Sequence, residues 1–274
     1  MVGNSRPLAI PGGGCSVFRP PGFSPTGFSG RGCRPVASRG VARSLPKSVR
    51  QLAHAAVQWG WTWAAQVGAI GPDDPEGRRF GAFGRGSVLT FPQGATYNER
   101  YIRIGEGTMV GPHACLTAGM APGQVMASDP VVRIGDRCVI GRGSHIVGHW
   151  SIEIGDDIQT GPYVYVTDQN HTYVDPDEPV GRQWPVEAPV KIGSGSWLGA
   201  NVVVLPGATI GEHVVVAAGA VVRGEIPDRC VVAGVPARIV RRWLPDRGWV
   251  DERAVDGRDG DRRPARSGVA DGGG

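Results

Sequence analysis

A six-residue pattern repeats through the middle of this 274-residue chain, from Ile104 to about Ile226. Each repeat begins with an aliphatic residue, usually continues with glycine, and has a small or β-branched residue at its fifth position. Short-period self-similarity of this kind defines repeat folds, so it constrains the fold more than any other feature. The hexads begin at Ile104, Val110, Leu116, Ile134, Ile140, Ile146, Ile154, Thr160, Val166, Ile192, Leu198, Val204, Ile210, Val216 and Val222.

Each hexad predicts a short strand followed by a turn. The aliphatic residue points inward, glycine permits the backbone geometry of the turn, and the fifth residue is small because the interior tapers. Three hexads close a triangular coil, and parallel strand pairing stacks successive coils about 4.8 Å apart. A single coil cannot bury its own apolar face, so we expect stability to come from stacking.

The repeat domain, residues 80–243, is flanked by segments that lack the pattern. Residues 1–43 are rich in Gly, Pro, Arg and Ser and predict a disordered extension, and residues 244–274 predict a disordered tail. Residues 44–79 predict a helix and a linker, because Ser44 suits an N-cap and apolar residues follow at helical spacing.

Three tryptophans, at positions 59, 61 and 63, crowd this predicted helix, whose cations are Lys47 and Arg50 alone. Helices that lie on membranes usually carry a strongly cationic face. We therefore expect the helix to pack on the repeat domain or on a neighbouring subunit.

Composition narrows the classes of function. The net charge of +4 is modest, and no basic helix or base-stacking motif indicates nucleic-acid binding. No apolar stretch is long enough to cross a membrane, and the first residues lack a signal-peptide core. The five cysteines have neither a disulfide nor a zinc spacing. We expect a cytoplasmic protein without a metal.

The stretch GSWLGANVVVLPGATIGEHVVVAAGAVVRGEIPDRCVVAGVPARIVRRW, residues 195–243, resembles the C-terminal signature of the hexapeptide-repeat acyltransferases. These include galactoside, maltose and streptogramin acetyltransferases and the acyltransferases of polysaccharide synthesis. The resemblance implies an all-β fold, a left-handed parallel β-helix, although parallel crossovers are ordinarily right-handed. It also implies a homotrimer with active sites between subunits, acetyl-CoA or another acyl-CoA as donor, and a small hydroxylated acceptor such as a sugar.

The repeats break at DQNHTY, residues 168–173, and resume at Ile192. His171 is the eighteenth residue counted from Ile154, at the last corner of a coil, where the family that the chain resembles carries its catalytic histidine before a protruding loop. An imidazole with an ordinary pKa of about 6.5 accepts a hydroxyl proton near neutral pH. We expect His171 to be the general base that activates the acceptor for direct attack on the thioester.

Four neighbours complete the predicted acceptor side. Asp168 either orients His171, binds the acceptor or caps a turn. Asn170 falls at a normally inward fifth position, and Gln169 stands beside it. His149 lies one coil below, near the same corner, where it either contacts the acceptor or belongs to the surface. Relatives of the galactoside type carry an Asn on the preceding coil, whereas this chain reads RGSH there, which argues against a galactoside acceptor.

The donor side is predicted on the last coils. Trp197 stands at an outward position and resembles the aromatic residue that lines the pantetheine channel. Small residues there let pantetheine approach the backbone, and arginines bind the CoA phosphates through charge-assisted pairs. The remaining predicted residues are Ala200, Ala218, Gly219, Arg223, Arg238 and Arg241.

Two other functions fit the same fold. A γ-type carbonic anhydrase would hold zinc between subunits with three histidines, chosen from His113, His145, His149 and His171. A non-catalytic scaffold subunit would keep the β-helix alone. The AGVPARIVRRW element and the loop after His171 favour the acyltransferase.

Overall fold

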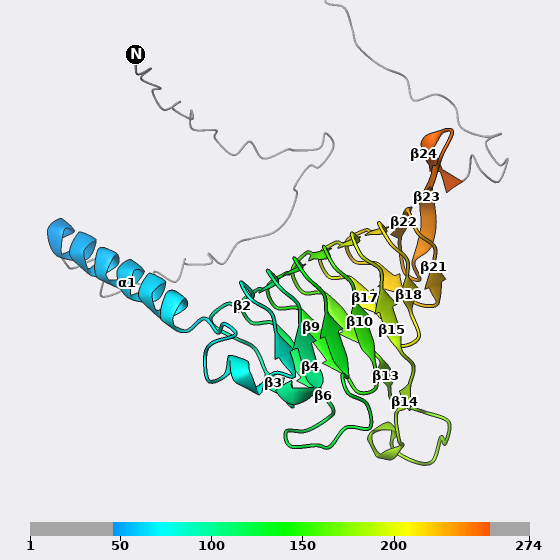
Figure 1. Cartoon of the computed structure of the whole chain (residues 1–274), viewed down its shortest axis with the longest axis horizontal. Helices are drawn as coiled ribbons and strands as arrows, with labels where there is room; N and C mark the ends of the chain where they lie inside the picture. The colour runs from blue at the N-terminus through cyan, green and yellow to red at the C-terminus, as the bar shows by residue number, and fades with distance from the viewer. Residues whose placement is uncertain (1–45, 253–274) are drawn as a thin grey trace, which may run out of the picture. The chain divides into compact units, whose positions relative to one another are not determined.

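The computed structural model describes residues 46–252, in which short strands stack as the coils of a parallel β-helix (Figure 1). The chain divides into two compact units, residues 1–52 and 53–274, and the division falls within helix α1 (Lys47–Val67). The second unit contains the β-helix. The disorder predicted for residues 1–43 concerns residues outside the described part of the chain.

Helix α1 confirms the helix predicted from the apolar spacing, and its first turn is closed by a 3.0 Å hydrogen bond from the N–H of Arg50 to the carbonyl of Pro46. No residue of α1 is buried. Three 3₁₀ turns follow: η2 (Gly77–Arg79), η3 (Glu99–Tyr101) and η4 (Val180–Arg182). Among residues 46–252, no helix combines the length and the apolarity that crossing a bilayer requires.

Three sheets form the three faces of the prism, and each coil visits them in the order B, A, C. Sheet B contains β1 (Ala82–Phe83), β4 (Ile102–Ile104), β7 (Val132–Ile134), β10 (Ile152–Ile154), β15 (Val190–Ile192), β18 (Thr209–Ile210) and β21 (Glu225–Ile226). Sheet A contains β2 (Val88–Leu89), β5 (Met109–Val110), β8 (Val139–Ile140), β11 (Gln159–Thr160), β16 (Trp197–Leu198), β19 (Val215–Val216) and three C-terminal strands. Sheet C contains β3 (Thr96–Tyr97), β6 (Cys115–Ala118), β9 (His145–Gly148), β12 (Tyr165–Thr167), β17 (Val203–Val204) and β20 (Val221–Val222).

The predicted interior of the prism is confirmed. The first residues of the hexads are all buried except Thr160, which is half-buried and accepts the N–H of Gly141 on its hydroxyl at 2.7 Å. The fifth positions that hold a small or β-branched residue are buried as well: Thr108, Ala114, Cys138, Ser144, Val164, Ser196, Val202, Ala208, Val214 and Ala220. Met120, Trp150 and Asn170, the fifth residues of the hexads that begin in β6, β9 and β12, are exposed. Parallel pairing places equivalent positions in register, so each aliphatic residue packs on its counterparts in the adjacent coils.

The glycine at the second position has a different physical reason from the predicted one. A Cβ on Gly141 would lie 2.1 Å from the carbonyl oxygen of Gly161 in the next coil, so the residue is small because adjacent coils approach closely. The left-handed backbone of the corner falls instead at the fourth position, as in Gly219 at φ 71° and Asn201 at φ 57°.

The repeat domain extends past its predicted boundary at residue 243. After β22 (Cys230–Ala233) the chain turns back, and β23 (Arg238–Leu244) and β24 (Gly248–Asp251) continue sheet A as an antiparallel ribbon. The prediction of disorder from residue 244 is therefore wrong for residues 244–252, where Trp243 and Trp249 pack edge to face. Residues 253–274 lie outside the described range.

The outward side chains give the three faces different chemistry. The outward row of sheet B is charged or polar: Arg103, Arg133, Glu153, Lys191, Thr209 and Glu225. The outward row of sheet A is mostly apolar: Val88, Met109, Val139, Gln159, Trp197, Val215 and Val231. On sheet C, Tyr165 is followed by Val203 and Val221. Two faces of the prism thus carry apolar side chains that remain at least partly exposed.

Candidate active site

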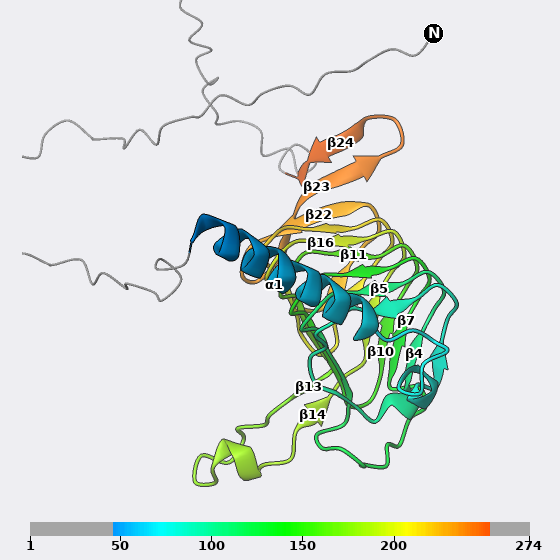
Figure 2. The same ribbon diagram turned by 90° about the vertical axis from the view of Figure 1, so that its left-hand side faces the viewer.

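The edge of the prism between sheets C and B carries both large interruptions of the coils. The chain leaves this edge at residues 119–130, here called the first corner loop, and again at residues 169–189, the second corner loop (Figures 1 and 2). The second loop begins and ends as an antiparallel pair, β13 (Gln169–Asn170) with β14 (Val186–Glu187). Because the coils on either side still pair, β10 with β15, the fold accommodates the insertion without losing its stacking.

Asp168 is fully buried at the root of the second corner loop. Its Oδ1 accepts the backbone N–H of His149 at 2.7 Å, and its Oδ2 accepts those of Trp150 at 2.8 Å and Ser151 at 2.6 Å. Burial raises the pKa of the Asp168 carboxyl, and these backbone donors act in the opposite direction. Of the roles predicted for Asp168, the geometry favours the turn cap, since its oxygens hold the turn of the coil below.

His149 occupies that turn and is buried against both corner loops. Its Nδ1 contacts Oε1 of Glu187, and its Nε2 lies 3.3 Å from Nε2 of Gln124 in the first loop. Oε1 of Gln124 accepts the N–H of Met120 at 2.8 Å, which fixes the orientation of the amide. An amide nitrogen only donates, so Nε2 of His149 accepts and its proton lies on Nδ1, facing Glu187. Both ring nitrogens of His149 are therefore occupied.

His171 lies three residues beyond Asp168, directly after β13, and its side chain is exposed. It is thus on the loop itself rather than at the corner of the coil. Asn170 is exposed too, which makes its predicted inward position wrong: the hexad ends where the chain leaves the coil at Asp168. Beside it, Oε1 of Gln169 is buried and has no hydrogen-bond partner within residues 46–252.

The predicted donor residues fall into two groups on different edges of the protomer. Arg223 and Arg238 line one hollow of about 380 Å³, together with Glu225 and Glu252. This hollow lies on the same edge as His171, because Ala188, Gly207 and Gly224 connect the successive coils there. The structure therefore brings two of the three predicted phosphate-binding arginines together.

The other group belongs to sheet A and to the edge between sheets A and C. Trp197 is 50% exposed and shares an outward row with Arg241. Ala200 stacks below Gly219, which donates its N–H to the carbonyl of Ala200 at 2.8 Å, and Ala218 precedes Gly219 in the same corner. Arg241 donates to the carbonyl of Trp249 at 3.3 Å and lies 3.8 Å from Asp251. One protomer does not place this second group beside His171.

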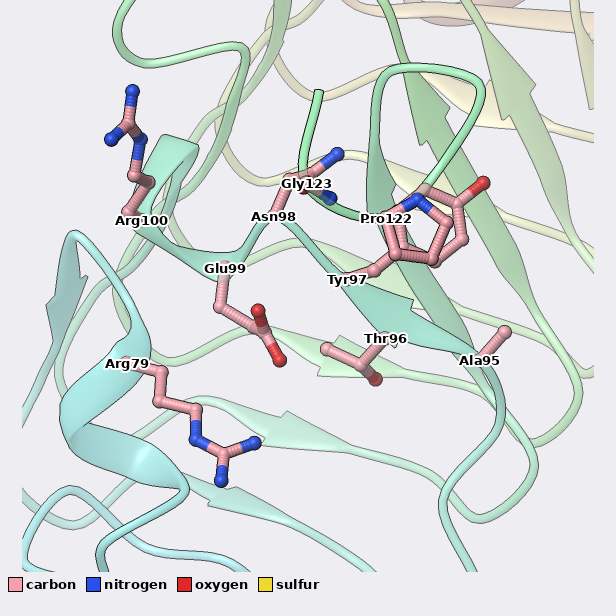
Figure 3. Close-up of a pocket in the computed structure, with 9 residues that line it drawn as sticks. All are labelled: Arg79, Ala95, Thr96, Tyr97, Asn98, Glu99, Arg100, Pro122 and Gly123. Atoms are coloured by element: carbon pink, nitrogen blue, oxygen red, sulfur yellow. The ribbon is translucent and has the colours of Figure 1, made fainter. Parts of the chain in front are cut away.

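Sequence reasoning missed the first corner loop and what it encloses. A hollow of about 600 Å³ is lined by Arg79 of η2, by Tyr97, Asn98 and Glu99 at the end of the first coil, and by Pro122 and Gly123 from the loop (Figure 3). Asn98 fixes the loop by donating to the carbonyl of Ala121 at 2.9 Å and accepting the N–H of Gly123 at 2.7 Å.

The available signal was the gap in the repeats between the hexad at Leu116 and the one at Ile134. That gap marks a second insertion at the same corner as the one after Asp168. Glu187 and Gln124 gave no sequence signal of their own, because residues outside the hexads have no repeat position to compare.

The carbonic-anhydrase alternative requires side chains that converge on a metal ion. Within the described range 46–252, no three or more His, Cys, Asp or Glu side chains of the protomer form a group that could hold an ion. His149, one of the four candidate ligands, is paired with Glu187 and Gln124.

Comparison with known proteins identifies the repeats. Residues 189–224 match the bacterial transferase hexapeptide (six repeats), and residues 131–167 match the hexapeptide repeat of succinyl-transferase. The probable acetyltransferase Rv3034c of Mycobacterium tuberculosis is 38% identical over 117 residues, 43% of this chain and 39% of the relative. The putative lipopolysaccharide biosynthesis O-acetyl transferase WbbJ of Escherichia coli is 38% identical over 106 residues, 36% of this chain and 54% of the relative.

The chain thus carries hexapeptide repeats like those of bacterial transferases in residues 131–167 and 189–224, and it is similar to acetyltransferases. It matches about two fifths and about half of the length of these two relatives. Among solved structures, the N-acyltransferase AntD of Bacillus cereus, in complex with dTDP and 3-hydroxybutyryl-CoA, aligns with a TM-score of 0.53 and 18% identity. The alignment covers 69% of this chain and 92% of AntD. The left-handed parallel β-helix is thereby confirmed as the fold.

Proposed function

We propose that the protein is an acyl-CoA-dependent O-acyltransferase with His171 as its general base, transferring acetyl in the simplest case. The acceptor is a sugar or another small hydroxylated molecule. The observation that carries the proposal is the arrangement of one edge of the β-helix, where an exposed imidazole on a corner loop is followed two coils later by the hollow of Arg223 and Arg238. The names of the two curated relatives, both acetyltransferases, agree with it.

The choice of base rests on the hydrogen bonds of the two imidazoles at this edge. The Nε2 lone pair of His149 accepts from Gln124, so His149 must break that contact before it takes a proton. The ring of His171 is exposed and makes no hydrogen bond within residues 46–252. His171 therefore has a lone pair free for the acceptor hydroxyl, and His149 serves to hold the two corner loops.

The chemistry follows from that base. Neutral His171 removes the acceptor proton while the oxygen attacks the thioester carbonyl. The C–S bond then breaks, the acyl group remains on the acceptor oxygen, and the imidazolium returns its proton to the CoA sulfur. No acyl-enzyme forms on this route. Buried Oε1 of Gln169, which lacks a partner within the described range, suits a second hydroxyl of the acceptor as hydrogen-bond donor.

The acyl-CoA donor would place its phosphates beside Arg223 and Arg238. Arg223 and Arg238 present guanidinium groups to one hollow, which suits the phosphates of CoA. Glu225 and Glu252 border the same hollow. Glu252 is paired with Arg242 at 2.9 Å, so Glu225 offsets part of the charge of the two arginines, and only part of the donor's phosphate charge is neutralised there. AntD, which has the same fold, was solved with an acyl-CoA, in agreement with this assignment.

A homotrimer would complete the site. Trp197 and the small residues Ala200, Ala218 and Gly219 lie on a different edge from His171, so a donor that touches both groups must lie between two protomers. The apolar outward rows of sheets A and C suit burial against neighbouring copies, whereas the charged row of sheet B suits water.

The test is a thiol-release assay with acetyl-CoA and a panel of acceptors that includes monosaccharides, oligosaccharides, nucleotide sugars and amino sugars. The proposal expects CoA release that depends on a hydroxylated acceptor and exceeds hydrolysis in its absence. Acyl transfer confined to amino sugars would overturn O-acylation and keep the donor site. CoA release at the hydrolytic rate with every acceptor, from protein that binds CoA, would support the scaffold alternative.

A further inference from the structure

The hollow beneath the first corner loop contains polar side chains that have no partner in the protein. The guanidinium of Arg79, the carboxylate of Glu99 and the hydroxyl of Thr96 point into the same space (Figure 3). None of these three side chains makes a hydrogen bond or an ion pair within residues 46–252. Oγ1 of Thr96 is also shielded from water, which makes the lack of a partner unfavourable. Unpaired polar groups that converge on one hollow indicate a ligand site.

Local structure holds these groups in place without engaging their side chains. The N–H of Gly81 donates to the carbonyl of Glu99 at 3.0 Å, which joins the end of η2 to η3 and brings Arg79 and Glu99 to the same hollow. The amide of Asn98, by contrast, is occupied in fixing the first corner loop. Arg79, Glu99 and Thr96 are therefore positioned by the backbone around them and remain available to a ligand.

The charges of the hollow favour a neutral ligand. Arg100 also lines it, but its guanidinium is turned away, donates to the hydroxyl of Tyr101 and lies 4.3 Å from the centre of that ring (Figure 3). Among the described residues of the lining, one unpaired cation, Arg79, and one unpaired anion, Glu99, remain. A phosphate would be attracted by the first and repelled by the second. A hydroxyl group suits both, because it accepts from a guanidinium and donates to a carboxylate.

The remaining lining suits the carbon face of a sugar ring. Tyr97 and Pro122 contribute apolar rings to the walls, and ligand pockets combine such walls with a few polar groups that fix orientation. The volume of about 600 Å³ lies within the usual range of small-molecule sites. We propose that this hollow binds a sugar unit of the acceptor, distinct from the unit that receives the acyl group.

The position of the hollow along the prism separates it from the acylated unit. It lies at the same edge as His171, and β3, β6, β9 and β12 are successive neighbours in sheet C. Three coil spacings, about 14 Å, therefore lie between the hollow and the root of the loop that carries His171. Gly123 forms part of the wall, and its neighbour Gln124 contacts His149 beside the second corner loop. The inference rests on the proposed function, and it makes the acceptor an oligosaccharide, because one sugar ring is too short to reach both places.

The experiment is calorimetry of the full-length protein, without acyl-CoA, with trisaccharides of glucose, galactose, mannose and N-acetylglucosamine and with UDP. We expect at least one trisaccharide to bind with a Kd below about 1 mM, and UDP not to bind. Arg79→Gln and Glu99→Gln should each weaken trisaccharide binding about tenfold or more, because each removes a hydrogen bond to a charged group. Thr96→Val should also weaken binding. It should not lower the stability of the protein, because valine replaces a hydroxyl that has no partner.

The matched control is Arg78→Gln, which removes the neighbouring exposed arginine of η2 that does not line the hollow, and should bind as the wild type does. No binding by any of the trisaccharides would overturn the proposal. So would UDP binding that Arg79→Gln abolishes, or trisaccharide binding that none of the three variants weakens.

Turnover with acetyl-CoA separates this proposal from the proposed function. In Arg79→Gln and Glu99→Gln, the KM for the trisaccharide should rise while kcat is retained, and the KM for the corresponding monosaccharide should not change. Turnover whose KM is independent of acceptor length and unchanged in both variants would overturn the sugar site and keep the acyltransferase. Trisaccharide binding that both variants weaken, in a protein without turnover, would overturn acyl transfer and leave the hollow as a sugar site.

Discussion

The imidazole of His149 contacts the carboxylate of Glu187 although the two residues lie 38 positions apart in the chain. Glu187 belongs to β14, by which the second corner loop returns to the prism, and His149 to the turn of the coil below. The outgoing root of the same loop is held to the same turn by Asp168. Both ends of the loop that carries His171 are thus held by hydrogen bonds to the turn that contains His149.

Removing the contact between Glu187 and His149 should make the second corner loop more mobile. Glu187→Gln leaves His149 without its charged partner, and we expect a loss of about 1–3 kcal/mol of stability, the range for a partly buried hydrogen bond to a charged group. Hydrogen exchange should rise across residues 171–185 while CoA affinity stays the same. Glu178→Gln, which removes an exposed ion pair with Arg182 in the same loop, should change stability by no more than about 0.5 kcal/mol.

The contribution of Asp168 to stability should depend on pH, because its carboxyl is buried. Because burial raises the pKa of the Asp168 carboxyl above its unfolded value, the folded protein holds that proton more tightly than the unfolded chain. The contribution of Asp168 to the free energy of unfolding should therefore increase as the pH falls through the raised pKa. The measurement is urea unfolding of the wild type and of Asp168→Asn at fixed protein concentration. The free energy of unfolding of the wild type should rise relative to that of the variant as the pH is lowered from 7 toward 4. A constant difference would mean that the carboxyl is not perturbed.

The hollow near the C-terminal strands should dominate donor affinity. Arg223→Ala and Arg238→Ala should each weaken CoA binding by about 1–3 kcal/mol, the range for a lost charge-assisted hydrogen bond. Calorimetry with CoA measures this directly, and Arg133→Ala, on the charged outward row of sheet B, is the control. Unchanged affinity in the Arg223→Ala/Arg238→Ala variant would place the phosphates elsewhere, with Arg241 on the other edge as the next position to test.

Cys138 should not be acylated by acetyl-CoA. Its side chain is fully buried, and burial raises the pKa of its thiol, so it remains protonated at neutral pH. We expect no acyl adduct on Cys138 by mass spectrometry after incubation with acetyl-CoA, and near-normal turnover for Cys138→Ser. An adduct on this residue would replace direct transfer by a covalent route.

The regular part of the fold was predictable because it repeats. Hexad positions identified the buried residues from Ile104 to Val222, because equivalent positions in successive coils point into the same interior. The hexads also placed the departure from the prism near residue 168. They misplaced Asn170, because the chain leaves the coil two residues before that hexad would end.

The site itself was less predictable than the coils. Glu187 and Gln124 meet at His149 from two different insertions, and a contact between insertions depends on tertiary arrangement that no repeat position records. The C-terminal ribbon was missed for a related reason. Residues 244–252 mix apolar and charged residues without the hexad period, and they form a strand only by extending sheet A beyond β22.

The central claim is that His171 takes the acceptor proton, and turnover of His171→Ala with a confirmed acceptor tests it most directly. The side chain is exposed, so the variant should fold, assemble and bind CoA as the wild type does. His213→Asn is the matched control, because it removes another exposed imidazole, at a φ of 53° that asparagine adopts readily. The account predicts that His171→Ala lowers turnover by about a hundredfold to ten-thousandfold. Turnover within about threefold of wild type, with CoA binding intact, would contradict it.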